Sequence, residues 1–154
     1  REAVRAISQK YCEAPSCFFI GRGLDYSLAE ESSLKCKEIS YIHCEAYPAG
    51  ELKHGTIALI EENTPVVAIV SGEMVREKTF SNIREVRARG GKVLLVTDRH
   101  AETQVADDLY IVPAKKLFPV CAAVFFQLFA YYGALLRGCD VDKPRNLAKS
   151  VTVE

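Results

Sequence analysis

The stretch PVVAIVSGEMVREKTFSNIREVRARGGKVLLVT, residues 65–97, decides the fold. It begins and ends with short, continuous apolar runs, Pro65–Val70 and Lys92–Thr97, which are typical of strands buried on both faces of a parallel sheet. Between them Met74–Arg89 has a helical pattern, and the pair Gly90–Gly91 follows it as a C-terminal stop signal. A strand, a helix and a second strand in this order predict a βαβ unit with a right-handed crossover.

The same alternation continues toward both ends of the chain. Cys17–Ile20 and Leu109–Val112 are two further continuous apolar runs. Helical patterns cover Arg1–Tyr11 and Asp25–Ile42, and a shorter helix is expected to open near Gly50. Alternating strands and helices predict an α/β fold, a three-layer α/β/α sandwich built on a parallel sheet.

One apolar segment, Leu117–Leu136, carries no charged side chain and is long enough to cross a bilayer. Pro119 and Gln127 weaken the membrane interpretation, and buried strands need a helical cover. We therefore expect a core helix and no membrane partner. Residues 1–138 are expected to form a single domain, and residues 139–154, which show no helical period, a C-terminal tail.

The composition is that of an ordinary globular protein, with 154 residues of which 49% are apolar and 26% charged. Lys plus Arg and Asp plus Glu number 20 each, so no basic field favours nucleic acid as a partner. The six cysteines form no C-x-x-C pair, and several lie in apolar runs, which predicts free thiols and a cytoplasmic location. The chain begins at Arg1 instead of Met, so we expect a piece of a longer protein.

In an open parallel sheet the ligand crevice lies outside the carboxyl ends of the strands. The loop after the first apolar run reads Gly21-Arg22-Gly23 and leads directly into a helix, an arrangement that points backbone N–H groups at an anion. These three residues are therefore candidates for substrate binding. They do not form a dinucleotide fingerprint, because Tyr26 stands where the third glycine would be. A tight strand-to-helix turn explains them equally well.

Lys35 and Glu38 are three residues apart on the predicted helix Asp25–Ile42, so they should share a face near its middle. By spacing alone, an exposed ion pair is the simplest interpretation. The following segment, residues 41–55, crowds titratable and aromatic side chains between two helix signals, as functional loops often do. His54 precedes a glycine there and could equally be a residue near a helix C-cap.

Four motifs resemble the glutamine-dependent glucosamine-6-phosphate synthase family, and the resemblance covers essentially the whole chain. The motifs are GRG (residues 21–23), KCKEISYIH (35–43), AYPAGELKHG (46–55) and DVDKPRNLAKSVTVE (140–154). The chain is similar to the second of that family's two sugar isomerase domains, whose fold is a flavodoxin-like α/β/α sandwich. The terminal motif is particular to this synthase family within the wider sugar isomerase superfamily.

The resemblance implies an enzyme that converts fructose 6-phosphate and ammonia from glutamine into glucosamine 6-phosphate and glutamate. It implies that Glu38 moves a proton between adjacent sugar carbons and that His54 opens the sugar ring. Lys149 would act in ring opening and imine formation. Lys35 would hold charge near the developing enediolate, and Arg145 would anchor the tail or an anion.

The resemblance also implies partners that these residues do not supply. They are a first sugar isomerase domain with a Ser/Thr-rich phosphate clamp, an amino-terminal glutaminase domain, and a second subunit in a homodimer whose active site receives His54. No metal and no cofactor is expected. The chain departs from the family pattern at positions where small or aliphatic residues are expected, namely Glu30, Glu31, Ser32, Ser33, Cys36 and Cys44.

Two other functions fit the same fold. A non-catalytic sugar-phosphate sensor is disfavoured, because a binding module would need neither the tail with Lys149 nor Glu38 and His54 together. A fructosamine-phosphate deglycase would keep the fold and much of the chemistry, and it would differ by lacking a glutaminase domain upstream of Arg1.

Overall fold

The computed structural model describes residues 1–99 and 104–147. Within them, helices and strands alternate along most of the chain. In chain order they are α1 (Glu2–Tyr11), β1 (Ser16–Gly21), α2 (Leu24–Ser40), β2 (His43–Pro48), the 3-10 helices η1 (Leu52–His54) and η2 (Thr56–Leu59), β3 (Pro65–Val70), α3 (Glu73–Arg87), β4 (Lys92–Thr97), β5 (Asp108–Ile111), η3 (Lys115–Leu117) and α4 (Phe118–Leu136).

The strands form one sheet in the order β2-β1-β3-β4-β5, and every neighbouring pair is parallel. This order is that of flavodoxin-like sheets. The central strand β3 is buried at all six positions, and its Val66 lies opposite Phe18 on one side and Val93 on the other. Continuous apolar runs therefore mark the interior strands, and the predicted parallel sheet is confirmed.

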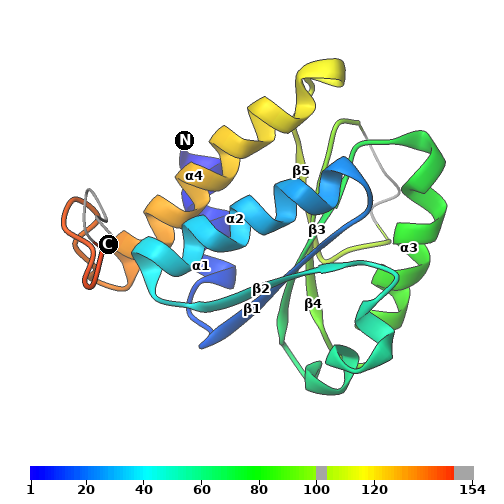
Figure 1. Cartoon of the computed structure of the whole chain (residues 1–154), viewed down its shortest axis with the longest axis horizontal. Coiled ribbons are helices and arrows are strands. Elements are labelled where there is room, and N and C mark those ends of the chain that lie inside the picture. The colour runs from blue at the N-terminus through cyan, green and yellow to red at the C-terminus, as the bar shows by residue number, and fades with distance from the viewer. Residues whose placement is uncertain (100–103, 148–154) are drawn as a thin grey trace, which may run out of the picture.

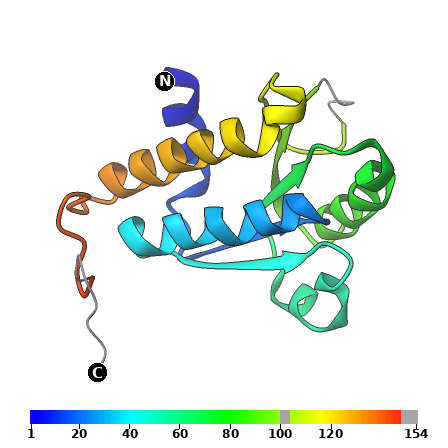
Figure 2. The ribbon, with the colours of Figure 1, turned by 45° about the horizontal axis from the view of Figure 1, so that its top comes forward.

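Helices cover both faces of the sheet, which makes three layers (Figures 1 and 2). Alternate strand residues pack under α1, α2 and α4, among them Cys17, Phe19, Val67, Ile69, Leu94 and Val96. The intervening residues pack toward α3 and the 3-10 helices, among them Phe18, Ile20, Val66, Ala68, Val93 and Leu95. The helices α2 and α4 lie side by side on the first face (Figure 2). The predicted α/β/α sandwich is confirmed.

The apolar helix α4 packs on the sheet, as expected for a core helix, but it is buried on one side only. Its inner face is aromatic and contributes Phe118, Phe125, Phe126 and Phe129 to the core. By length and hydropathy the segment Lys115–Leu136 is the one described helix that could also cross a membrane, and 39% of its apolar window is buried. The opposite side of the segment exposes Leu117, Val120, Val124, Tyr131, Leu135 and Leu136.

The strand β2 was not predicted, because residues 43–48 were expected to form a loop. This strand lies at the edge of the sheet and pairs only with β1, so its side chains alternate between polar and apolar instead of forming a continuous run. Cys44 and Ala46 face the core under α2, whereas Tyr47 packs on the opposite face. The helix expected near Gly50 is found as two short 3-10 turns, η1 and η2.

Candidate active site

The C-terminal end of α2 carries the ion pair that the sequence predicts. Lys35 Nζ lies 2.8 Å from Glu38 Oε2 and 3.6 Å from Glu31 Oε1. The hydrogen bond to Glu38, helped by the charges of both glutamates, raises the pKa of Lys35 despite partial burial. The two side chains belong to the last turns of a helix that ends at Ser40, so the expectation that they lie near its middle is wrong.

The C-terminal segment docks at the same end of α2. Tyr41 ends α2 in the left-handed conformation, with φ of 59°, and its hydroxyl accepts a hydrogen bond of 2.8 Å from the backbone N–H of Arg145. The Arg145 guanidinium lies 4.1 Å from the centre of the Tyr41 ring, a cation–π contact. The structure thus brings Arg145 to the end of α2 that holds Lys35 and Glu38. Lys149 lies outside the described residues.

The Gly21-Arg22-Gly23 turn lies at the opposite end of α2. A Cβ atom at Gly21 would lie 2.5 Å from the backbone carbonyl of Asp25, so only glycine lets the helix start this close to the strand. Arg22 is already engaged, because its Nη2 donates a 2.9 Å hydrogen bond to Asn82 on α3. The turn therefore connects β1 to α2 and, through Arg22, to α3, as expected for a tight strand-to-helix turn.

His54 also lies far from Glu38 in the same chain. It ends η1, which follows the carboxyl end of β2, and its side chain is exposed. Glu38 lies 14 residues after Leu24, the first residue of α2, which is about 21 Å along the helix axis. Because α2 connects the parallel strands β1 and β2, it must run antiparallel to them. Its C-terminal end therefore lies at the end of the sheet where the strands begin, whereas His54 follows the end of a strand (Figure 2). The described chain does not bring Glu38 and His54 together.

A polar cluster at the carboxyl edge of the sheet was missed by the sequence analysis. The buried carboxylate of Asp25 accepts hydrogen bonds from the backbone N–H of Ser71 (2.9 Å) and from its hydroxyl (2.6 Å). Burial raises the pKa of Asp25, against the effect of these two hydrogen bonds. Asp98, after β4, pairs with Arg76 at 3.3 Å and with Arg99 at 3.1 Å. The available signal was that Ser71 and Asp98 each directly follow a predicted strand.

An open crevice of about 660 Å³ adjoins this cluster. It is lined by Ser71, Asp98, Arg99, Lys115 and Lys116. Both donor groups of Ser71, which would suit a phosphate, are instead directed to the Asp25 carboxylate. The described residues at this end of the sheet therefore combine cations with two carboxylates. Among them, Ser71 is the one hydroxyl residue in the lining of the crevice, and its hydroxyl already donates to Asp25.

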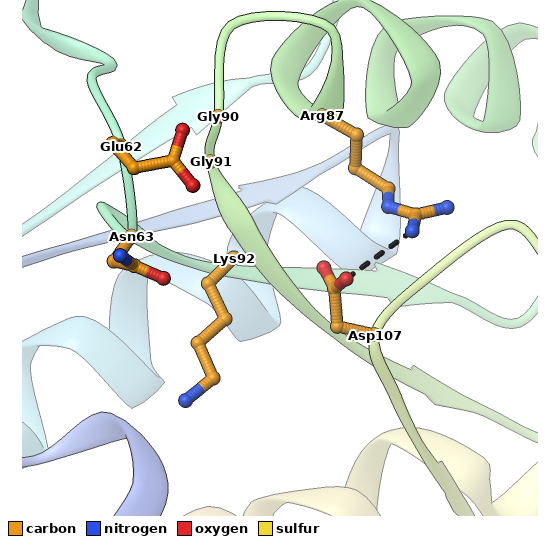
Figure 3. A pocket seen from close by; sticks show the side chains of 7 residues that line it. All are labelled: Glu62, Asn63, Arg87, Gly90, Gly91, Lys92 and Asp107. Atoms are coloured by element: carbon orange, nitrogen blue, oxygen red, sulfur yellow. Dashed lines mark hydrogen bonds and ion pairs between the residues drawn. The ribbon is translucent and has the colours of Figure 1, made fainter.

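A second crevice, of about 380 Å³, lies at the amino end of β4 (Figure 3). Two of its charged side chains, Arg87 and Asp107, hold the loop before β5 in place. Arg87 Nη2 lies 3.2 Å from Asp107 Oδ1, and the other oxygen of Asp107 accepts a hydrogen bond from the backbone N–H of Val93. A Cβ atom at Gly90 would collide with the Glu62 carboxylate, so this corner is a tightly packed turn.

Replacing Gly21 by Ala should destabilise the chain by about 2–4 kcal/mol, because the new methyl group meets backbone atoms that only a shift of α2 can move. Urea denaturation of the variant and the unsubstituted chain measures the difference. Gly72→Ala is the matched control, since its Cβ would meet only Val75 Cγ2 at 3.5 Å, and it should cost less than about 1 kcal/mol. Equal losses in both variants would contradict the argument from close approach.

Comparison with known proteins agrees with the fold and the motifs. The family model described as "SIS domain" matches residues 10–137. The glutamine–fructose-6-phosphate aminotransferases of Caldanaerobacter subterraneus subsp. tengcongensis and Streptococcus pneumoniae are 52% and 51% identical to the chain, and each match covers 100% of it and 26% of the relative. The chain thus spans about a quarter of the length of these curated relatives.

Two solved structures share the architecture. The C-terminal domain of the glucosamine-fructose-6-phosphate aminotransferase from Francisella tularensis has a TM-score of 0.85 at 41% identity, over 92% of this chain and 41% of that one. The glucosamine-6-phosphate deaminase from Thermotoga maritima has a TM-score of 0.71 at 27% identity, over 98% of this chain and 46% of that one. The matched residues, the parallel sheet and these likenesses together show that the chain belongs to the SIS domain family.

Proposed function

We propose that this chain is the C-terminal isomerase domain of a glutamine–fructose-6-phosphate aminotransferase. The full-length protein would convert fructose 6-phosphate and glutamine-derived ammonia into glucosamine 6-phosphate and glutamate. The observation that carries the proposal is the docking of the C-terminal segment on Tyr41, at the end of α2 that carries the Lys35–Glu38 pair. Identity of about 50% to aminotransferases over the whole chain supports the same conclusion.

Glu38 is the proposed proton carrier. Isomerisation shifts a proton between C1 and C2 of the open-chain sugar, and one carboxylate can serve first as the base and then as the acid. The Lys35 ammonium lies 2.8 Å from this carboxylate, on the same face of α2. As charge develops on the enediolate oxygens, the same ammonium can stabilise it.

The tail and His54 complete the proposed site. Arg145 is held on Tyr41 at the C-terminal end of α2, and Lys149 is the amine proposed for ring opening and imine formation. His54, proposed for ring opening, is exposed at the other edge of the sheet. It would therefore act in the active site of a neighbouring subunit of a homodimer. Gly21 and Gly23 would shape the turn, and Arg22 would brace it.

The exposed outer face of α4 supports the proposal that this chain contacts further domains or subunits. It presents a row of exposed apolar side chains at helical spacing, namely Leu117, Val120, Val124, Tyr131 and Leu135. Contiguous apolar surface of this kind commonly marks an interface. We propose that the first sugar isomerase domain and the glutaminase domain of the parent protein, together with a second subunit, are the partners, and that the protein acts in the cytoplasm.

This chain alone should bind glucosamine 6-phosphate weakly, with a dissociation constant above about 10 μM, which corresponds to less than ~7 kcal/mol. Both donor groups of Ser71 are taken up by Asp25, and a phosphate in the crevice would also face the carboxylate of Asp98. Calorimetric titration of the chain provides the measurement, and the full-length parent is the positive control. A tighter constant, lost in a Lys115→Ala/Lys116→Ala variant, would place a phosphate site in the crevice of this domain.

A further inference from the structure

Three thiols meet in the core below the C-terminal half of α2. Cys17 on β1 and Cys44 on β2 are partners in the register of two adjacent parallel strands, and both side chains point toward α2. Cys36 lies on α2, in the helical layer above them. All three residues are buried, and each is a free thiol. This cluster is separate from the Lys35–Glu38 pair, which lies on the more exposed side of the same helix.

The strand register places Cys17 and Cys44 within reach of a disulfide. Adjacent strands lie about 4.8 Å apart, and disulfides join Cα atoms that are ~4.4–6.8 Å apart. Cys36 would have to bridge from the helical layer to the sheet, so Cys17 is the better positioned partner for Cys44.

The three thiols are not equivalent. Interaction with the neighbouring thiols of Cys17 and Cys36, together with the nearby charges of Lys37 and His43, lowers the pKa of Cys44 against the effect of burial. Interaction with Cys44, together with burial, raises the pKa of Cys17 and of Cys36. Cys44 is therefore the first of the three to form a thiolate, the form that reacts with oxidants.

Access to Cys44 has a structural route. The strand β2 lies at the edge of the sheet and pairs only with β1, so separating it breaks one strand ladder and the packing of β2 under α2. Local openings of this kind occur in native proteins at a lower free energy than global unfolding. An oxidant as small as hydrogen peroxide can then reach the thiolate.

We propose that Cys44 and Cys17 form a redox-modifiable pair, which hydrogen peroxide converts into a buried disulfide between β1 and β2. The Cys44 thiolate attacks one peroxide oxygen, an S–O bond forms, the O–O bond breaks, and the departing hydroxide takes up a proton to become water. The Cys17 thiol then attacks the Cys44 sulfur, the S–S bond forms, and the S–O oxygen leaves as a second water molecule with the Cys17 proton. Two thiols are oxidised and one peroxide is reduced to two waters.

Peptide mapping of the full-length parent protein tests the pair. After exposure to hydrogen peroxide, the remaining thiols are alkylated in denaturant and the protein is digested with trypsin without reductant. The sequence predicts that residues 11–22, which contain Cys12 and Cys17, become linked to residues 38–53, which contain Cys44. Fragmentation should place the bond at Cys17, and dithiothreitol should restore both unlinked peptides.

Matched variants separate this pair from its neighbours. Cys17→Ala should abolish the link and leave a Cys44 sulfenic acid that dimedone traps, whereas Cys12→Ala should leave the link intact. Cys121→Ser removes an exposed thiol and should also leave it intact. The proposal is overturned if wild-type protein links Cys44 to Cys12 or Cys36, or if Cys17 and Cys44 remain fully alkylated while the more accessible Cys121 and Cys139 are oxidised.

Discussion

Glu38→Gln in the full-length parent protein should lower the rate of isomerisation by roughly 10²- to 10⁴-fold, the usual contribution of one positioned acid–base group. The substitution keeps the shape of the side chain and its place in the last turns of α2, but it removes the carboxylate that pairs with Lys35 at 2.8 Å. Exchange of the sugar's C1 or C2 proton with solvent measures the step directly.

Glu31→Gln is the control that the structure provides. Glu31 lies about two turns before Glu38 on the same helix and contacts the same lysine, at 3.6 Å, but it is more exposed than Glu38. Its loss weakens an exposed ion pair, so proton exchange should change by no more than about threefold, which corresponds to well under 1 kcal/mol. If the two variants behaved alike, or if Glu38→Gln exchanged protons at the unsubstituted rate, the pair would be no more than a surface salt bridge.

The parts of the fold that the sequence predicts correctly are those where one physical effect dominates. Continuous apolar runs can be buried on both faces, so β3 was predicted at its observed bounds, Pro65–Val70, and β4 at Lys92–Thr97. The edge strand β2 has one partner strand, and its alternating side chains resemble those of a polar loop. Edge strands are therefore harder to recognise from hydrophobicity alone.

The candidate site shows a different limit. The spacing of Lys35 and Glu38 places them on one helical face, and this contact was predictable because it is local. The contact between Tyr41 and Arg145 spans more than 100 residues, so no local pattern could reveal it. The same holds for Asp25 and Ser71, which meet only because β1 and β3 are neighbours in the sheet.

The separation of Glu38 and His54 has a functional consequence. Each chain of the proposed homodimer would supply Glu38 to one active site and His54 to the other, because the two residues lie at opposite edges of the sheet in a single chain. An active site that contains both then needs two subunits. Two inactive variants, Glu38→Gln and His54→Ala, should therefore complement each other when their subunits are exchanged.

In a mixed dimer both substitutions fall in one active site, and the other site receives an unsubstituted Glu38 and an unsubstituted His54. Random exchange makes about half of the dimers mixed, each with one intact site, so activity should recover to roughly a quarter of the unsubstituted value for a closed two-fold dimer. Mixing Glu38→Gln with Lys35→Met is the matched control, because Lys35 and Glu38 touch within one chain and every site then carries a defect. Recovery in the control, or none in the first mixture after native mass spectrometry has confirmed exchange, would mean that His54 does not act across the dimer.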